Sequence, residues 1–371
     1  MSTPPLPNQI ADELAAMRQA LALAEQAIGL SDPNPRVGCL IVAADGRVLG
    51  AGHTQAAGQA HAEVMALRDA AARGADVRGA TAYVTLEPCS HHGRTPPCCD
   101  ALIAAGLGRV VAAVGDPNPL VAGQGMARLR AAGIAAETGL LADEARELNI
   151  GFFSRMQRGR PFVRLKIAAS LDGRTALLNG ASQWITAEAA RSDGHAWRKR
   201  AGAVLSGIGT VRDDDPRLDV RLVETARQPL RVVIDSRLET PVSARLLPPP
   251  GQVLIYAAVP AGSRPDLQAA GAEIASLPGP GGKVDLAAAL ADLGARGINE
   301  LHVEAGHKLN GSLLREGLVD ELLVYLAPKL LGQGREMAAF GPLESLKDAL
   351  QWRWLDCRPV GQDLRLRARP A

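Results

Sequence analysis

The 371-residue sequence contains few aromatic residues, with four tryptophans, three tyrosines and four phenylalanines. Proteins that bind single-stranded nucleic acids stack the bases on aromatic side chains inside a positively charged groove. Here 41 basic and 39 acidic residues give a formal charge of +2, and both signs are scattered along the chain. The sequence therefore argues against a nucleic-acid partner, and it predicts a core built mainly from alanine, leucine, valine and glycine.

Long apolar segments are also missing. No charge-free apolar run reaches the roughly 18 residues that a transmembrane helix requires. The first residues, MSTPPLPNQIADELAAM, lack the basic region and apolar stretch of a secretory signal. We therefore expect a cytoplasmic protein that has no membrane partner.

A disulfide scaffold is equally unexpected, because the five cysteines are an odd number in a long chain. Cys89, Cys98 and Cys99 lie within eleven positions. Such crowding in a cytoplasmic protein indicates a metal site or catalysis. Cys39, in a predicted buried strand, and Cys357, in a predicted terminal strand, are expected in the core.

The length predicts about two domains, at roughly 150 residues each. In the first part, apolar residues spaced three and four apart predict a helix over 10–28, and residues 37–52 predict a strand hairpin. Helices and strands then alternate up to Asn149. This order predicts an α/β/α layered domain.

The second part shows another series of alternating elements and no internal repeat. The basic stretch SRMQRGRP (154–161) is the best linker candidate. We place the first domain at 1–158 and the second at 159–371, with a closing hairpin at its end. Strands are predicted near 162–170, 203–207, 230–235, 252–257, 300–304 and 321–327, and helices near 187–200, 284–296 and 308–316.

The first domain carries residues typical of a catalytic zinc site. His61 and Glu63 open a predicted helix, Cys89 follows a strand, and Cys98 opens the next helix. One imidazole and two thiolates leave the fourth tetrahedral position to water, and a carboxylate beside it can shuttle protons. His-x-Glu followed by Pro-Cys-x-x-Cys is the signature of zinc nucleobase deaminases, although eight residues separate the two cysteines here.

Three other residues that could bind the metal lie between these two cysteines or directly after them. His91 and His92 are interpreted as loop or substrate contacts, and Cys99 as a core residue, but their roles stay open. A structural zinc site would use four protein ligands and would have no use for Glu63.

The second domain gives weaker signals. Gly207-Ile208-Gly209 follows a strand but lacks the third glycine of a dinucleotide fingerprint, because Arg212 holds that position. Lys166 lies in an apolar strand, where a charge needs a partner or a function. Glu304 ends a strand, which is where such sheets bind ligands, and the helix start at 306–312 offers free amides to a phosphate.

Two charged stretches of the second domain are predicted to face solvent. The acidic run Asp213–Asp215 is expected to form a solvated loop. The basic residues of the predicted helix over 187–200 are expected to form an exposed face, with one or two of them binding a phosphate-bearing substrate: Arg191, His195, Arg198, Lys199 and Arg200.

The motif TLEPCSHHGRTPPC (85–98) resembles the bifunctional riboflavin biosynthesis family, a pyrimidine deaminase fused to a reductase. The resemblance covers nearly the whole chain and keeps the family order. The other matching motifs are NPRVGC (34–39), HAEV (61–64), GDPNPLVAGQG (115–125), KIAASLDGR (166–174), SQWIT (182–186), GTVRDDDP (209–216), VEAG (303–306) and APKLLG (327–332).

The resemblance implies a cytidine-deaminase-like α/β/α fold for the first domain and a dihydrofolate-reductase-like α/β fold for the second. It implies one Zn²⁺ in the deaminase domain, NADPH in the reductase domain, and a homo-oligomer, either a dimer or a tetramer. The implied substrate is a small phosphorylated pyrimidine, 2,5-diamino-6-(5-phosphoribosylamino)pyrimidin-4-one. It would be deaminated first, and its ribosyl side chain would then be reduced to ribityl.

The resemblance also assigns residues. Zinc would be bound by His61, Cys89 and Cys98, Glu63 would move protons, and Asn34 would hold the substrate. Lys166 and Asp214 are candidates for catalytic proton or charge support in the reductase. NADPH would contact Ala168, Trp184, Thr210, Asp214, Ser236, Gly306, His307, Lys308, Leu309, Asn310, Gly311 and Ser312. The reductase substrate would contact Ser182, Arg198, Leu218, Arg221 and Glu304.

Two enzymatic alternatives remain. One is an active deaminase with an inactive reductase-like domain, which the intact SQWIT and VEAG motifs oppose. The other is a nucleic-acid-editing deaminase, which the near-zero charge and scarce aromatics oppose.

Overall fold

The computed structural model describes residues 8–91, 96–119 and 121–371, so His92 lies outside the described residues. The chain forms two compact units, Met1–Gly159 and Arg160–Ala371, each with its own sheet. Among the described residues, no helix has both the length and the apolar character needed to cross a membrane.

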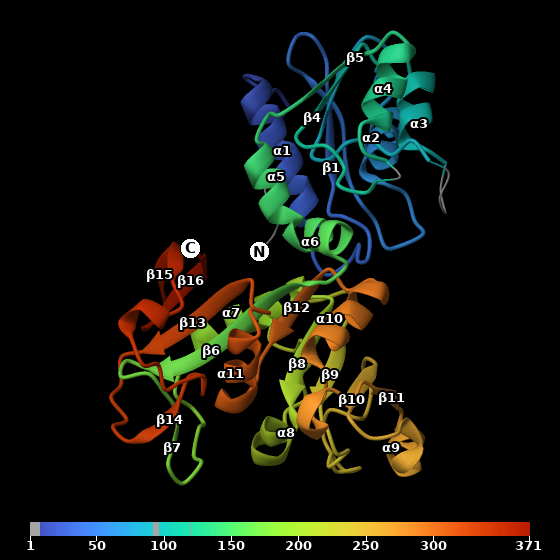
Figure 1. Ribbon diagram of the computed structural model, residues 1–371. Coiled ribbons are helices and arrows are strands. Elements are labelled where there is room, and N and C mark those ends of the chain that lie inside the picture. Colours follow the sequence, from blue (N-terminus) through green and yellow to red (C-terminus); the bar gives the residue numbers. More distant parts are fainter. Residues whose placement is uncertain (1–7, 92–95, 120) are drawn as a thin grey trace. The chain divides into compact units, whose positions relative to one another are not determined.

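The first unit is built on a five-stranded mixed sheet in the order β2-β1-β3-β4-β5 (Figure 1). β1 runs antiparallel to both of its neighbours, and β3, β4 and β5 are parallel. The strands are β1 (Gly38–Val42), β2 (Val48–His53), β3 (Thr81–Val84), β4 (Arg109–Ala112) and β5 (Ala135–Thr138). The helices are α1 (Glu13–Glu25), α2 (Ala62–Ala72), α3 (Cys98–Ala104), α4 (Gln124–Ala131), α5 (Ala142–Leu148) and α6 (Ile150–Arg158).

Helices cover both faces of this sheet, which gives the predicted α/β/α layers: α1 and α5 lie on one face, and α2, α3 and α4 on the other (Figure 1). Small residues allow the helices to pack closely. A Cβ at Gly38 would lie 1.9 Å from the Ala20 carbonyl oxygen of α1, and one at Gly50 would lie 2.2 Å from the Ala66 carbonyl oxygen of α2. The core therefore packs tightly with few aromatic side chains.

The boundary between the two units falls inside the predicted linker at 154–161, after Gly159, but most of that stretch is helical, because α6 continues to Arg158. Phe152 and Phe153 are buried on this helix, and their rings pack edge to face. The arginines of the stretch lie on its remaining surface. The basic segment is therefore helical because it continues an amphipathic helix whose apolar face begins before residue 154.

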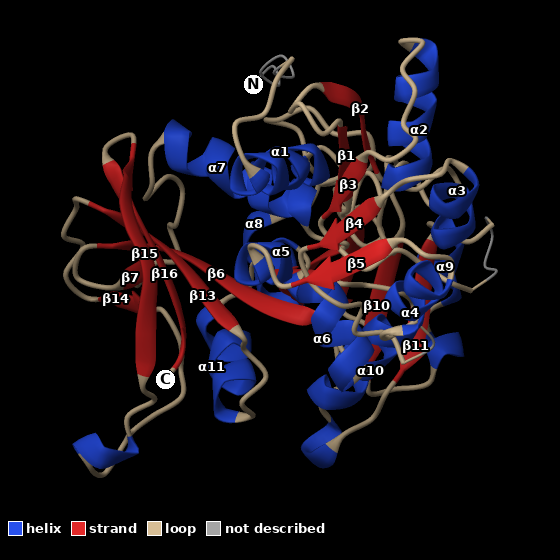
Figure 2. Ribbon diagram, turned by 90° about the horizontal axis from the view of Figure 1, so that it is seen from above, coloured by secondary structure: helices blue, strands red, loops and turns tan. Residues whose placement is uncertain are grey.

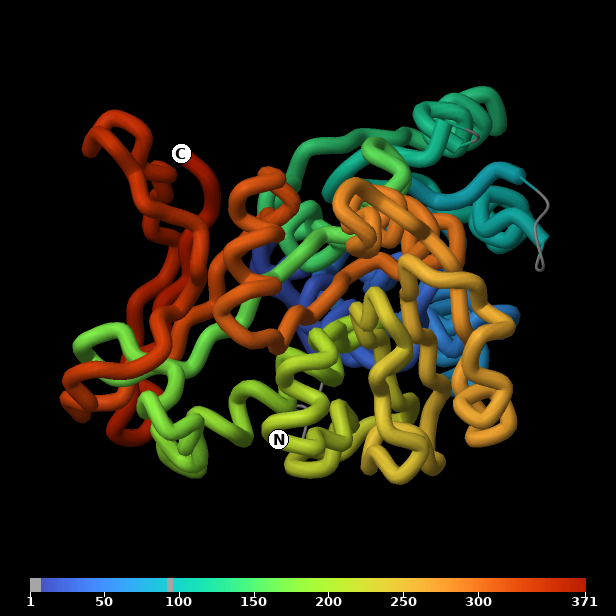
Figure 3. Tube along the Cα trace, turned by 60° about the horizontal axis from the view of Figure 1, so that its bottom comes forward, coloured from blue at the N-terminus to red at the C-terminus, as the bar shows by residue number. Residues whose placement is uncertain are grey.

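The second unit contains a nine-stranded sheet in the order β11-β10-β9-β8-β12-β6-β13-β16-β15. The first seven strands of this order are parallel, and the C-terminal strands β16 and β15 (red in Figure 3) add an antiparallel edge. The short strands β7 and β14 pair separately with each other (Figure 2). The strands are β6 (Phe162–Ser170), β7 (Arg174–Leu177), β8 (Ala203–Gly207), β9 (Leu230–Ile234), β10 (Val253–Ala257), β11 (Ala272–Ser276), β12 (Glu300–Val303), β13 (Glu321–Ala327), β14 (Gly334–Glu336), β15 (Trp352–Val360) and β16 (Asp363–Pro370).

The helices of the second unit are α7 (Glu188–Arg200), α8 (Ile208–Asp214), α9 (Pro265–Ala269), α10 (Leu286–Ala295) and α11 (His307–Arg315). Apolar residues of α10 and α11 join one core cluster with alternate residues of the strands, such as Val163 and Leu165 of β6. The intervening residues of β6, such as Arg164, point to the opposite face, because strand side chains alternate. That face meets α7, and it is strongly charged.

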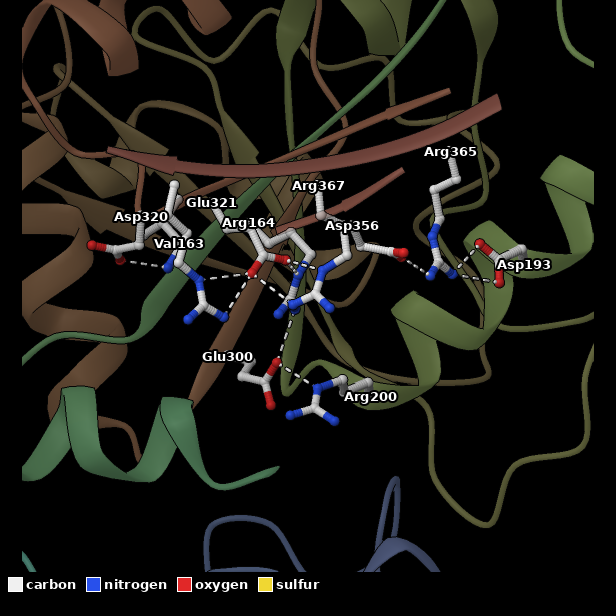
Figure 4. Close-up of polar contacts among 11 residues, drawn as sticks. Val163, Arg164, Asp193, Arg200, Glu300, Asp320, Glu321, Asp356, Arg365 and Arg367 are labelled. Atoms are coloured by element: carbon white, nitrogen blue, oxygen red, sulfur yellow. Dashed lines mark hydrogen bonds and ion pairs between the residues drawn. The ribbon is translucent and has the colours of Figure 1, made fainter. Parts of the chain in front are cut away.

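A buried ion network joins α7 to the sheet (Figure 4). Arg164 donates to Glu321 at 2.7 Å and to Glu300 at 2.8 Å, and all three side chains are almost fully buried. Glu300 also accepts from Arg200 of α7 at 2.9 Å. The Trp197 ring of α7 lies 4.3 Å from the Arg164 guanidinium carbon, measured to the ring centroid. Charge pairing and cation–π contacts thus join this helix to the sheet beside a small apolar cluster, in which Ala190 of α7 packs with Leu323 and Tyr325 of β13.

Candidate functional site

In the first unit, α2 and α3 begin at the same end of the sheet and bring three metal-ligand types together. His61 is the N-cap residue of α2, with extended backbone angles, and Cys98 is the first residue of α3. Cys89 lies in the loop after β3. The three ligand atoms all lie within 4.8 Å of one another, and the Cys98 and Cys89 sulfurs are 3.3 and 3.7 Å from His61 Nδ1. This donor set suits Zn²⁺, which binds thiolates and imidazoles tetrahedrally.

Hydrogen bonds prepare this group for a cation. The Cys98 backbone N–H donates to Cys89 Sγ at 3.3 Å. The side-chain hydrogen bond from Cys98 is the largest cause that lowers the pKa of Cys89; together with the nearby imidazole of His61 it outweighs burial and brings that pKa to about 4. The same bond and burial raise the pKa of Cys98. A divalent cation favours two thiolates at such a site, and its binding releases protons.

Glu63 stands beside the ligands in the first turn of α2. Its side chain is buried, with 3% relative exposure. Burial raises its pKa to about 7, and the negative charge of Cys89 adds to that effect. A carboxyl group with such a pKa can both accept and donate a proton near neutral pH, which is what a general acid–base residue requires.

Glu87 was not singled out from the sequence, yet it shapes the wall of this site. Its buried carboxylate accepts four backbone N–H bonds at distances of 2.9 to 3.3 Å. Two come from the segment between β4 and α4, at Asp116 and Gly123, and two from the first turn of α4, at Gly125 and Met126. Burial raises the pKa of Asp116 to about 6, and the charges of Glu87 and Cys89 contribute. The sequence places Glu87 directly before the Pro88-Cys89 pair, but it does not show the backbone N–H groups that this carboxylate binds.

The other cysteines lie away from the ligand group. Cys99 is fully buried, and its thiol donates to the carbonyl oxygens of Pro88 and Gly125 at 3.3 and 3.5 Å. Cys39 is buried in β1, as predicted. Cys357 is exposed on β15, so its predicted place in the core is wrong; β15 is an edge strand with one open face.

Two further residues predicted for this site have no part in the ligand group. Asn34 lies in the loop before β1, partly buried, and its contact with substrate stays a prediction. His91 is not part of any such group among the residues that the structure describes.

The geometry predicts which cysteine is essential for metal binding. Cys98→Ala removes one of three ligands, so we expect the purified protein to lose most of its zinc. Cys99→Ala is the matched control, because the adjacent thiol bonds only to carbonyl oxygens, and it should keep about one zinc per chain. Zinc content by atomic emission measures both. Full zinc in Cys98→Ala, or zinc loss only in Cys99→Ala, would show the ligand assignment to be wrong.

In the second unit, the carboxyl ends of the parallel strands open into a cleft of about 1550 Å³. This edge of an open α/β sheet is the common ligand-binding position. Every reductase residue predicted from the sequence lines this cleft except Gly311: Lys166, Ala168, Ser182, Trp184, Arg198, Thr210, Asp214, Leu218, Arg221, Ser236, Glu304, Gly306, His307, Lys308, Leu309, Asn310 and Ser312.

Glu304 is the electrostatic centre of the cleft. It accepts from Arg198 Nε at 2.5 Å and Nη2 at 2.9 Å, and Lys166 Nζ lies 3.8 Å away. His302 Nε2 lies 3.2 Å from the same carboxylate. Burial raises the pKa of Glu304, but Arg198 and Lys166 outweigh burial and hold that pKa well below its usual range. Glu304 therefore stays charged.

Polar contacts also organise the entrance loop at 182–186. Ser182 donates to Asp214 at 3.1 Å. Lys329 Nζ donates to the carbonyl oxygens of Trp184 and Ile185 at 3.1 and 2.7 Å. The Trp184 side chain is 62% exposed, although it lines the cleft. Such a ring is available to a planar ligand.

The start of α11 fits a dinucleotide. Asn310 is buried and lines the cleft, and its Nδ2 donates to the Met337 carbonyl oxygen at 2.9 Å, while its Oδ1 has no partner in the described structure. An orphaned acceptor on a cleft wall indicates a hydrogen-bond donor on the ligand. Gly311 points elsewhere, since a Cβ there would lie 2.0 Å from the Ala339 carbonyl oxygen. Its missing side chain therefore allows close packing, and its contact with the cofactor stays a prediction.

Two sequence predictions about charged segments are wrong. The acidic run is not a loop, because Asp213 and Asp214 are the last residues of the helix α8. The glycines at 207–209 did not suggest a helix at this place. The basic residues of α7 are not an exposed face either, because His195 and Arg198 are buried and Arg200 pairs with Glu300. Their acidic partners come from strands about 100 residues later, so local sequence could not reveal the burial.

Comparison with known proteins relates both units to described families. Residues 11–114 match the family described as cytidine and deoxycytidylate deaminase zinc-binding region, and residues 161–366 match the RibD C-terminal domain. The chain is 48% identical over 361 residues to the riboflavin biosynthesis protein RibD of Escherichia coli (strain K12), covering 94% of this chain and 96% of that relative. The protein of the same name from Aquifex aeolicus is 42% identical over 349 residues, with 94% and 96% covered.

Two solved structures agree over nearly the full length. Acinetobacter baumannii RibD, form 1, superposes with a TM-score of 0.89 at 43% identity, covering 96% of this chain and 98% of that one. A diaminohydroxyphosphoribosylaminopyrimidine deaminase/5-amino-6-(5-phosphoribosylamino)uracil reductase from Thermotoga maritima superposes with a TM-score of 0.86 at 33% identity, with 96% and 98% covered. Both predicted domain folds are thereby confirmed.

Proposed function

The chain belongs to the RibD family of bifunctional riboflavin biosynthesis enzymes, and we propose that residues 1–158 form its zinc-dependent deaminase and residues 159–371 its NADPH-dependent reductase. The observation that carries the proposal is the meeting of His61, Cys89 and Cys98 within 4.8 Å, beside the buried Glu63. The substrate is the phosphorylated diaminopyrimidine. Deamination exchanges its amino group for oxygen, consuming one water and releasing one ammonia.

In the deaminase, His61, Cys89 and Cys98 would hold Zn²⁺, which supplies a Lewis acid that activates water near neutral pH. Glu63 then handles the protons. Its carboxylate takes a proton from the attacking water and delivers it to the ring nitrogen, and the leaving amino group receives a proton in the same way. Because the Glu63 side chain is buried beside the ligands, its carboxyl group is shielded from bulk water. Asn34 would hold the pyrimidine.

In the reductase, NADPH supplies a hydride, which would pass to C1′ of the ring-opened ribosyl imine. The start of α11 and the residues Ala168, Trp184, Thr210, Asp214 and Ser236 would bind the cofactor. Lys166, whose Nζ lies 3.8 Å from the Glu304 carboxylate, would provide the proton that balances the hydride. Arg198, Arg221, Ser182 and Leu218 would contact the phosphorylated substrate together with Glu304.

Metal removal separates the two activities. We expect chelation of zinc to abolish ammonia release from the diaminopyrimidine while NADPH oxidation on the deaminated intermediate continues at its original rate. The reason is that the two sites share no residue. Loss of both activities in a protein that keeps its fold, or ammonia release without zinc, would contradict the assignment. If the protein does not oxidise NADPH even before zinc is removed, the result would favour a reductase-like unit without activity.

We further propose a homo-oligomer. β15 is an edge strand of the nine-stranded sheet, and Trp354 on it is largely exposed. An exposed edge with an aromatic residue favours pairing with another chain. Light scattering coupled to gel filtration tests this, and a monomer at assay concentration would contradict it. The cytoplasmic location stays a prediction.

A further inference from the structure

The loop that follows α8 in the second unit has a costly backbone conformation. Asp215 has a φ of 42° and Leu218 a φ of 53°, so two residues that carry a Cβ lie in the left-handed region. Such residues persist only where surrounding contacts hold them. Leu218 and Arg221 both line the reductase cleft. Whatever holds this loop therefore also shapes the binding surface.

Three side chains from outside the loop hold its backbone. The Gln228 amide donates to the Val220 carbonyl oxygen and accepts from the Val220 N–H, both at 2.8 Å. Arg198 Nη1 donates to the Asp219 carbonyl oxygen at 2.8 Å. His195 Nδ1 accepts the Arg221 backbone N–H at 3.1 Å. Of these three contacts, only the one from His195 holds the backbone of a residue, Arg221, whose own side chain is expected to contact the substrate.

His195 is well suited to this task. It is buried, with 4% relative exposure, and it lies one turn before Arg198 on α7. An imidazole nitrogen accepts a hydrogen bond only when it is unprotonated. The Arg221 backbone nitrogen lies 3.1 Å from Nδ1, closer than Arg198 Nη1 lies to Nε2 at 3.5 Å, so we assign the ring proton to Nε2. Arg198, Arg221, Glu304 and Asp219 are the charged groups that face the ring. Burial, followed by the two arginines, lowers its pKa to about 4, so the acceptor is present throughout the neutral range.

We propose that His195 is a positioning residue of the reductase: through Nδ1 it fixes the Arg221 backbone, and so it presents Arg221 to the phosphorylated substrate. The Arg221 guanidinium is in turn aimed by the Asp219 carboxylate, to which Nη1 donates at 2.6 Å. His195 itself is not among the residues that line the cleft. The proposal rests on the function proposed above, because it takes the cleft to be the substrate site.

A pair of amide variants isolates the contact. Asparagine places its side-chain oxygen where histidine carries Nδ1, whereas glutamine places its amide group where histidine carries Nε2. We expect His195→Gln to raise the KM for the deaminated intermediate about tenfold, because a buried N–H loses its acceptor. The kcat and the KM for NADPH should change little. His195→Asn should restore the KM to within about threefold of the wild-type value.

Hydrogen exchange gives a readout that does not depend on activity. Mass spectrometry of peptides covering 217–222 should show faster amide exchange in His195→Gln than in the wild type, with protection regained in His195→Asn. Equal KM values in the two variants, or an unchanged exchange rate in His195→Gln, would overturn the proposal. A wild-type protein without reductase activity would refute the proposed function, while the exchange experiment would still decide the role of His195 in the loop.

Discussion

Replacing Glu63 by glutamine is expected to reduce ammonia release from the diaminopyrimidine about a thousandfold, since positioned general acid–base groups contribute roughly 10²–10⁴. Glutamine keeps the size of the side chain but can neither take a proton from water nor deliver one. Glu63 is buried beside the three ligands, and among the described residues no carboxylate belongs to the ligand group itself. NADPH oxidation on the deaminated intermediate should be unaffected.

Two controls make this result interpretable. Zinc content should remain at about one per chain, which separates lost proton transfer from lost metal. Glu144→Gln, at an exposed position of α5, should leave both activities intact. If Glu63→Gln deaminates at more than about a tenth of the wild-type rate, then Glu63 is not the proton shuttle.

The second large effect concerns stability. Glu321 has no exposed surface and accepts from Arg164 at 2.7 Å, from Arg367 at 2.9 Å and from Arg369 at 2.8 Å (Figure 4 shows the first two). Removing one partner from a buried ion cluster leaves uncompensated charge, at a typical cost of about 3–5 kcal/mol. We expect Glu321→Gln to lower the free energy of unfolding of the second unit by that amount.

The scarcity of aromatic residues makes this measurement selective. All four tryptophans, Trp184, Trp197, Trp352 and Trp354, belong to the second unit. Tryptophan fluorescence during urea denaturation of the full chain therefore follows that unit alone. Glu336→Gln, at an exposed position of β14, is the matched control and should change little. A shift below about 1 kcal/mol in Glu321→Gln would mean that the network does not stabilise the fold.

The same carboxylate predicts a pH dependence. Burial alone would raise the pKa of Glu321, but Arg164 and Arg367 outweigh burial and lower it to about 2. The unfolded chain, with an ordinary carboxyl pKa, takes up the proton first as the pH falls. The stability that Glu321 contributes is therefore complete above about pH 5 and is lost as the pH falls toward 2. In Glu321→Gln this part of the acid dependence should disappear.

The zinc site was predictable because its chemistry lies at element boundaries that the sequence marks clearly. His61 precedes a helix, Cys89 follows a strand, and Cys98 opens a helix, so each side chain points out of its element toward one place. Glu87 was overlooked for the opposite reason. Its partners are backbone N–H groups, and no residue pattern reveals a carboxylate that caps a loop.

The reductase half was less predictable, because long-range pairing decides its burial. Arg164 looks like a surface residue until Glu300 and Glu321, well over 100 positions away, surround it. For the same reason, the arginines of α7 were expected in solvent. Gly311 was assigned with its neighbours to the cofactor, whereas its missing side chain makes room for the Ala339 backbone. Contacts of this kind depend on the tertiary fold and leave no local periodicity.

One measurement tests the central claim, that a single chain performs both reactions in order. The zinc-loaded protein is incubated with the diaminopyrimidine substrate, with and without NADPH, and the products are identified by mass spectrometry. Without NADPH we expect only the deaminated 5-aminouracil compound. With NADPH we expect that compound carrying two additional hydrogen atoms, as a ribityl side chain. Unchanged substrate in both samples, or the same product with and without NADPH, would contradict the account.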